Sequence, residues 1–177
     1  MALHRLRHDR GFTLIELLIV VAIISIIAAF AVPGLLRSKM NANEASAIVS
    51  LHAIRDSQMS YAVSCGNGGF AATLPTLGGA TPGAADAFLA SPDLTSSATP
   101  SKSGYTFTMA AGAGAAAGPV DCHGTATTTT YYVTAAPLTF GSSGGRSFAM
   151  STGGVIWQVY TATPPPEPFG PPAQPVQ

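Results

Sequence analysis

Residues 12–36 have the sequence FTLIELLIVVAIISIIAAFAVPGLL, a run of 25 residues in which Glu16 is the only charged side chain. About 20 apolar residues suffice for a helix to cross the hydrocarbon core of a bilayer. The run therefore predicts a transmembrane helix. Pro33 and Gly34 lie near its end and predict a helix kink, within the helix or at the membrane boundary, because proline removes a backbone donor and clashes with the preceding turn.

The charges around this run orient it. Arg5, Arg7 and Arg10 precede it together with Asp9, whereas from Phe12 onward there are five basic and seven acidic residues. The positive-inside rule therefore predicts a cytoplasmic N-terminus and places the rest of the chain across the membrane. The net charge of zero gives no indication of a nucleic-acid surface. A length of 177 residues leaves room for one modest folded domain.

The order of segments differs from that of a secretory signal peptide, because the small residue Gly11 precedes the apolar run instead of following it. The string Gly11-Phe12-Thr13-Leu14-Ile15-Glu16 closely resembles the type IV prepilin signature. The resemblance implies that a prepilin peptidase cuts between Gly11 and Phe12, removing residues 1–11 as a basic leader, and then methylates the new amine of Phe12. It also implies the α+β type IV pilin fold, a long N-terminal helix packed on an antiparallel sheet.

Glu16 is a charged residue inside an apolar helix, where ionisable side chains are costly and usually functional. After cleavage the nearest cation at that depth is the Phe12 amine of the same or a neighbouring subunit. The resemblance assigns this pair to the addition of subunits during assembly. The alternative is a glutamate that extends to the membrane interface.

The helix is expected to continue as an amphipathic segment over residues 37–64, because apolar residues recur at steps close to three and four. These residues are Ile48, Leu51, Ile54, Met59 and Ala62. The strings Asn43-Glu44-Ala45-Ser46-Ala47 and Leu51-His52-Ala53-Ile54 resemble bacterial type IVa pilins more than secretion pseudopilins. Cys65 and Gly66 follow, and glycine is common at a helix C-terminus.

Residues 65–160 are expected to form an extracytoplasmic globular domain. Cys65 and Cys122 lie in it, and a disulfide can persist in that compartment. We therefore predict that they are bridged. No metal site is predicted, because His123 supplies at most a third zinc ligand without paired spacing.

Strand patterns begin after a loop over residues 70–103, in which one helical turn is expected near 84–89. Alternating or β-branched runs at 105–109, 128–135, 146–151 and 155–160 predict a four-stranded antiparallel meander. Residues 136–156 resemble the C-terminal hairpin of bacterial pilins. Residues 161–177 contain seven prolines and are expected to form an extended or disordered tail, solvated or bound by a proline-recognising partner.

The remaining motifs do not indicate catalysis. Residues 141–145 match a nucleophile elbow but precede a strand, which favours a turn. The glycines of residues 112–118 precede no helix and are expected to lie in a flexible loop. Asp86, Asp93 and Asp121 are expected to be solvated loop charges, although some pseudopilins hold calcium with comparable residues. No cofactor is implied, and the chain is not expected to be an enzyme.

The resemblance implies a structural subunit of a type IV pilus. Its expected partners are other copies of itself in a helical filament, prepilin peptidase, the assembly machinery of the inner membrane, and lipid before assembly. The expected location is the inner membrane for the single-pass precursor, and then an extracellular pilus or a periplasmic pseudopilus. The alternatives are a type II secretion pseudopilin, a minor pilin, and a monomeric membrane-anchored binding domain. Adhesion, twitching motility, DNA uptake, secretion and electron transfer remain open as uses of such a filament.

Overall fold

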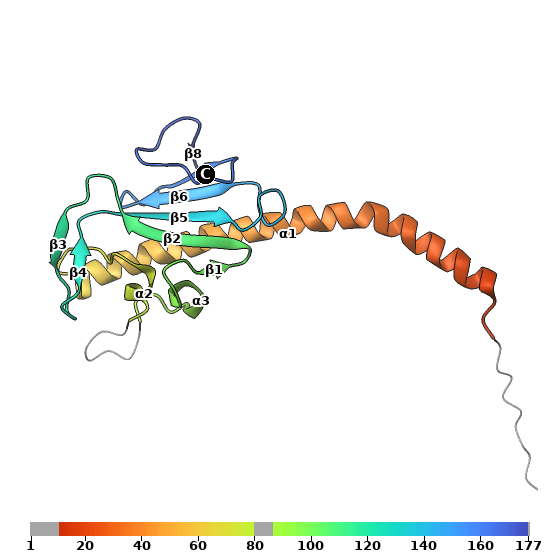
Figure 1. Ribbon diagram of the computed structural model, residues 1–177, viewed down its shortest axis with the longest axis horizontal. Helices are drawn as coiled ribbons and strands as arrows, with labels where there is room; N and C mark the ends of the chain where they lie inside the picture. The colour runs from red at the N-terminus through yellow and green to blue at the C-terminus, as the bar shows by residue number, and fades with distance from the viewer. Residues whose placement is uncertain (1–10, 80–86, 177) are drawn as a thin grey trace, which may run out of the picture. The chain divides into compact units, whose positions relative to one another are not determined.

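The computed structural model describes residues 11–79 and 87–176 (Figure 1). It confirms an α+β fold with one long N-terminal helix and an antiparallel sheet. The chain forms two compact units, of which the first ends at Ser38 and the second begins at Lys39. The sheet and the second half of the helix belong to the second unit.

The helix, α1, spans Leu14–Ser64 and has 51 residues. It ends where the sequence predicted, because the chain turns at Gly66, whose amide donates to the carbonyl of Tyr61 at 2.7 Å. Pro33 lies inside α1 without interrupting it. Proline has no amide hydrogen, so the carbonyl of Ala29 loses its helical donor there. A kink at Pro33 and Gly34 stays a prediction.

The main sheet is antiparallel and has the strand order β1-β2-β5-β6-β7-β8. The predicted meander is confirmed by its middle four strands, which pair in chain order with Phe107 opposite Ala135 and Val133 opposite Met150. Two short strands extend it at the edges beyond what the sequence predicted. The strands are β1 (Ser101–Lys102), β2 (Tyr105–Ala111), β5 (Tyr131–Pro137), β6 (Ser147–Ser151), β7 (Ile156–Val159) and β8 (Gln174–Pro175).

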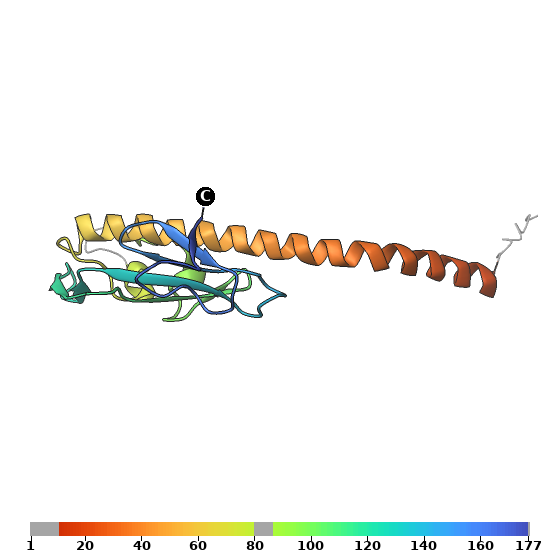
Figure 2. The same cartoon turned by 90° about the horizontal axis from the view of Figure 1, so that it is seen from above.

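The second unit has two layers, with residues 39–64 of α1 lying along one face of the sheet (Figure 2). Alternate residues of the middle strands point to this face, as the pleat requires. Together with the helix they form one apolar core. Its largest fully buried side chains are Leu51, Ile54 and Tyr61 from α1, and Tyr105, Phe107, Tyr131, Phe148 and Met150 from the sheet.

The buried face of the helix departs from the predicted one at Met59, which is 55% exposed. A step of five residues turns a helix by about 140° from the starting direction, so Met59 cannot share a face with Ile54. Ser57 and Gln58 occupy the core side instead. Gln58 is satisfied there, because its amide group donates to the carbonyl of Ala71 and accepts from its amide, both at 2.9 Å.

A second, two-stranded sheet consists of β3 (Ala117–Val120) and β4 (Ala126–Thr128). The glycine-rich segment expected to be a flexible loop therefore contains the start of a strand, in which a side chain at Gly118 would collide with the Thr127 hydroxyl. The short helices are α2 (Leu74–Leu77) and α3 (Pro92–Thr95). Half of the helical turn expected near 84–89, residues 84–86, lies outside the described residues, and residues 87–89 are not helical.

The proline-rich segment over residues 161–176 is packed on the sheet, so the disordered form of the expected extended or disordered tail is wrong. Proline cannot donate a hydrogen bond, but this segment mostly accepts them. The carbonyl of Pro165 accepts from the Tyr132 hydroxyl at 2.7 Å, and the Glu167 carboxylate accepts from the Ala113 amide at 2.7 Å. Phe169 stacks on Trp157 with ring centroids 5.4 Å apart. The segment ends as β8 along the edge of β7.

Candidate functional site

The predicted cleavage point lies immediately before the helix. Gly11, Phe12 and Thr13 are exposed and belong to no helix or strand, so the bond between Gly11 and Phe12 is open to an enzyme that binds extended chain. A Cβ added to Gly11 would meet nothing within 4 Å. The fold of this chain therefore does not require a glycine here, and a requirement for one would come from a molecule that binds the segment.

Glu16 has a local structural role that the sequence analysis missed. Its amide donates to the Thr13 hydroxyl at 3.2 Å, and that hydroxyl lies 3.5 Å from its carboxylate. The Thr13 hydroxyl thus caps the first turn of α1, at the Thr-x-x-Glu spacing of a capping box. The Thr-x-x-Glu pattern was the available signal. Among the residues that the structure describes, Glu16 forms no ion pair.

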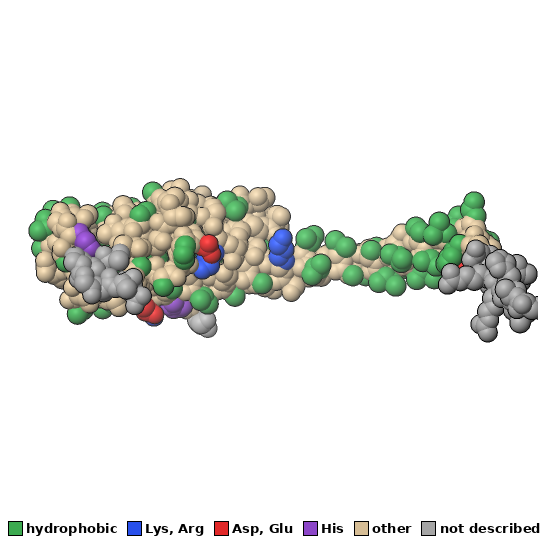
Figure 3. Space-filling model, turned by 90° about the horizontal axis from the view of Figure 1, so that it is seen from below, with side chains coloured by type: hydrophobic (Ala, Val, Ile, Leu, Met, Phe, Trp, Pro, Cys, Tyr) green, Lys and Arg blue, Asp and Glu red, His purple; other side chains and the backbone are tan. Residues whose placement is uncertain are grey.

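The first half of α1 presents apolar side chains in every direction. Sixteen large apolar residues between Phe12 and Leu36 are exposed. On the face seen in Figure 3, hydrophobic side chains crowd the narrow helical stretch. An 18-residue window of the helix reaches a mean hydropathy of 2.9 with none of it buried. A helix that is apolar all round must be covered by other helices or by lipid. The helix is long and apolar enough to cross a membrane.

The start of the second half of α1 is anchored to the sheet by a buried ion pair. Glu44, whose side chain is 7% exposed, accepts from Arg146 Nη2 at 2.6 Å and from its Nε at 2.8 Å. The Gly145 amide also donates to the Glu44 carboxylate, at 2.8 Å. Arg146 also donates a hydrogen bond from Nη1 to Gln158 Oε1 at 2.6 Å. No local pattern indicates this pairing, because its members lie 102 residues apart.

The other end of α1 is anchored by Tyr61, whose hydroxyl donates to the Asp121 carboxylate at 2.6 Å. Asp121 is buried, which corrects its expected place among solvated loop charges. Its second oxygen accepts from the amides of His123 and Thr125 at 2.9 and 2.6 Å. Burial raises the pKa of Asp121, but the hydrogen bonds from Tyr61, Thr125 and His123 outweigh it, so the net pKa lies below its ordinary value.

Cys65, directly after the end of α1, forms a disulfide with Cys122 in the loop between β3 and β4. Their Cα atoms are 4.8 Å apart. The Cys122 amide also donates to the Cys65 carbonyl at 2.8 Å. The structure therefore pairs the two cysteines as predicted. Of the three aspartates considered for calcium, Asp86 lies outside the described residues and Asp93 is exposed in α3, whereas Asp121 serves the anchor at Tyr61.

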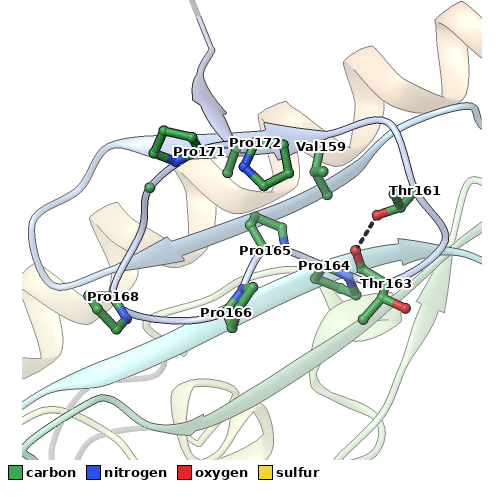
Figure 4. A pocket seen from close by; sticks show the side chains of 11 residues that line it. Val159, Thr161, Thr163, Pro164, Pro165, Pro166, Pro168, Pro171 and Pro172 are labelled. Atoms are coloured by element: carbon green, nitrogen blue, oxygen red, sulfur yellow. Dashed lines mark hydrogen bonds between the residues drawn. The ribbon is translucent and has the colours of Figure 1, made fainter.

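The proline-rich segment encloses a hollow of about 310 Å³ (Figure 4). Proline rings form most of its wall, and the Thr161 hydroxyl donates to the carbonyl of Thr163 at its rim. The residues that line it carry no carboxylate, imidazole, amine or thiol. The hollow therefore has no group that could act as an acid or base near pH 7.

The N-terminal segment matches known proteins. The family model described as the prokaryotic N-terminal methylation motif matches residues 6–32. The type IV major pilin protein PilA of Myxococcus xanthus is 45% identical over 53 residues, which are 30% of this chain and 24% of that protein. The type IV wide pilus major component PilA4 of Thermus thermophilus is 56% identical over 39 residues, 22% of this chain and 30% of that protein.

A third relative comes from a secretion system. The type II secretion system core protein G of Vibrio cholerae is 37% identical over 57 residues, which are 32% of this chain and 39% of that protein. The matched segments thus span between about a quarter and two fifths of these relatives. No solved structure matches the chain.

Proposed function

We propose that the chain is a member of the type IV pilin family and a structural subunit of a type IV pilus, which its methylation motif and its identity with two major pilins support. It acts by assembling with copies of itself and not as an enzyme. The observation that carries this proposal is the apolar surface of residues 12–36, which covers every side of the helix and is exposed in the single chain. Copies of the helix bundled in a filament core would cover that surface once it leaves lipid.

The precursor is a single-pass protein of the inner membrane, with the basic leader in the cytoplasm. Prepilin peptidase cuts between Gly11 and Phe12 and the Phe12 amine is methylated. The exposed, non-helical backbone of these residues supports this step, as does the motif match over residues 6–32. After cleavage the whole apolar helix stays on the mature chain, which is then handed to the assembly machinery.

Glu16 contributes its charge to assembly through the Phe12 amine of a neighbouring subunit. An unpaired carboxylate is costly in lipid, which favours the docked position where a cation meets it. The helix cap does not depend on this charge, because the Thr13 hydroxyl accepts from the backbone amide of Glu16. Glu16→Gln therefore removes the charge with little effect on the helix start.

The test uses cells that express only one form of the chain. Surface protein from wild-type cells should have the intact mass of a chain that begins at N-methylated Phe12, and surface filaments should be visible. Cells with Glu16→Gln should hold cleaved, oxidised chain in the membrane and make no filaments. A mature chain that begins at Met1, or normal filaments from Glu16→Gln, would contradict the proposal.

A pseudopilin of a type II secretion system is the second candidate, and the identity with core protein G favours it. Removing the chain separates the two. Loss of surface filaments with normal protein secretion supports the pilus, whereas loss of secretion with normal filaments supports the pseudopilus. A minor pilin would be present in few copies per filament, and a monomeric anchored domain would leave both processes unchanged.

A further inference from the structure

The disulfide lies beside a histidine, and together they gather three metal-binding atoms. His123 Nδ1 is 3.5 Å from Cys65 Sγ and 3.4 Å from Cys122 Sγ. The donor atoms of the three residues all lie within 4.8 Å of one another. Cys65 is buried, whereas Cys122 and His123 are exposed, so an ion can reach the group from solvent.

These distances fit one metal in particular once the sulfurs are thiols. Tetrahedral zinc has Zn–S distances of about 2.3 Å and Zn–N distances of about 2.0–2.1 Å, which place nitrogen and sulfur about 3.5 Å apart. His123 Nδ1 already has this spacing to both sulfurs. Only the two sulfurs need to separate, to about 3.8 Å by the same geometry, and the exposed Cys122 side chain is free to rotate outward.

The backbone around the group is held by bonds that do not involve the disulfide. The Cys122 amide donates to the Cys65 carbonyl, and Tyr61 donates to Asp121 at 2.6 Å. On the other side, Asn67 Nδ2 donates to the Val120 carbonyl at 2.8 Å. These contacts keep the two segments adjacent when the cysteines are reduced. The Asp121 carboxylate, 4.0 Å from His123 Nδ1, adds negative charge next to the group.

We propose that the thiol form of this chain binds one Zn²⁺ through Cys65 Sγ, Cys122 Sγ and His123 Nδ1, with water in the fourth position. Binding releases the two thiol protons, so two thiolates balance the charge of the ion. Disulfide formation transfers two electrons from these thiolates to a disulfide-bearing oxidant, joins the sulfurs and releases the zinc. The metal and the disulfide are therefore mutually exclusive, and either one ties the end of α1 to the loop before β4.

The test uses the full chain in detergent, reduced with a phosphine and then freed of it under anaerobic conditions. Titration with Co²⁺ as a zinc analogue should give the absorption bands of tetrahedral cobalt bound to thiolate, saturating at one equivalent. Added Zn²⁺ should remove these bands. His123→Ala should weaken zinc binding by at least about 100-fold, since loss of even an outer-shell partner costs about 10–100-fold. His123 is exposed, so this variant should fold normally.

Two controls make the result decisive. His52→Ala, which removes a histidine of α1 away from the group, should leave zinc affinity unchanged, and the oxidised wild type should give no cobalt–thiolate bands. Equal zinc affinity in the wild type and His123→Ala would overturn the proposal. A Cys65→Ser, Cys122→Ser variant that binds as tightly as the reduced wild type would also overturn it. A reduced wild type that does not bind zinc or cobalt stoichiometrically would overturn it as well.

Discussion

The two halves of α1 belong to one continuous helix but differ in how much of their surface the rest of the chain covers. Residues 14–38 carry apolar side chains on all sides and bury none of them in the chain. Residues 39–64 bury a single stripe that includes Ala47, Leu51, Ile54 and Tyr61 against the sheet. Polar anchors hold the second half near both ends, through Glu44 and through Tyr61 with Cys65.

This contrast shows how one secondary structure element serves two purposes. The second half has its cover within the chain, so the stability of the sheet domain depends on contacts in its own unit. The first half has no such cover and depends on lipid or on other copies. A substitution should therefore affect folding in the second half and association with lipid or other copies in the first.

The sharpest test makes the same substitution in both halves. Ile54→Asp buries an unpaired carboxylate at a position that is 0% exposed, and should destabilise the sheet domain by more than about 5 kcal/mol. Ile24→Asp changes a side chain that is 59% exposed and should leave thermal unfolding of that domain unchanged. This substitution should instead make the free energy of membrane insertion less favourable by about 2.5–3.5 kcal/mol. Thermal unfolding in detergent and membrane fractionation measure the two effects, and equal losses of domain stability would contradict the division.

Removing the disulfide should have the next largest effect on the stability of the sheet domain. Cys65→Ser with Cys122→Ser opens a closure across 57 positions, which on the chain-entropy estimate lowers the unfolding free energy by about 4 kcal/mol. The membrane segment should insert as before. Denaturant unfolding of the detergent-solubilised chain measures the change, in the presence of a chelator so that no metal replaces the bridge. A loss below about 1 kcal/mol would show that the hydrogen bonds at this end suffice.

The ion pair between Glu44 and Arg146 should contribute somewhat less to the unfolding free energy than the disulfide. Arg146→Ala leaves the buried Glu44 carboxylate without its cation and should cost about 3 kcal/mol, the lower end for a broken buried pair because Arg146 is 27% exposed. Arg55→Ala is the matched control, since its pair with Asp56 lies at the surface and should contribute less than about 1 kcal/mol. Denaturant unfolding measures both variants. Equal losses of unfolding free energy would contradict the stabilising role of the Glu44–Arg146 pair.

The smallest effect should come from Tyr61→Phe, which removes one charged hydrogen bond at a cost of about 2 kcal/mol at pH 7. The folded pKa of Asp121 lies below its ordinary value of 3.8, so its carboxylate stabilises the fold above that pH. This contribution is lost as the pH falls through the lower folded pKa. The difference between variant and wild type should therefore shrink in strong acid. Unfolding measured at several pH values checks this, and a constant difference would mean that Asp121 is not the partner.

Local patterns in the sequence were enough for the long helix and for the four middle strands. The apolar run and the Gly-Phe-Thr motif predicted the helix and its start, and Cys65-Gly66 predicted its end. Alternation predicted the four middle strands to within a few residues. The prediction of Met59 on the core side was wrong, because Ser57 and Gln58 are polar and their hydrogen bonds to distant backbone were invisible in the pattern.

The sequence by itself determined that this chain has a leader motif, a long apolar helix and an antiparallel sheet, because helix and strand periods repeat over a few residues. Tertiary structure alone decided which charges are buried and which segments are packed. Glu44 meets Arg146 across 102 positions, and Asp121 meets Tyr61 across 60. The proline-rich segment packs because Tyr132, Ala113 and Trp157 offer it donors and a ring. Such partners are set by the folded path of the chain, which local spacing does not encode.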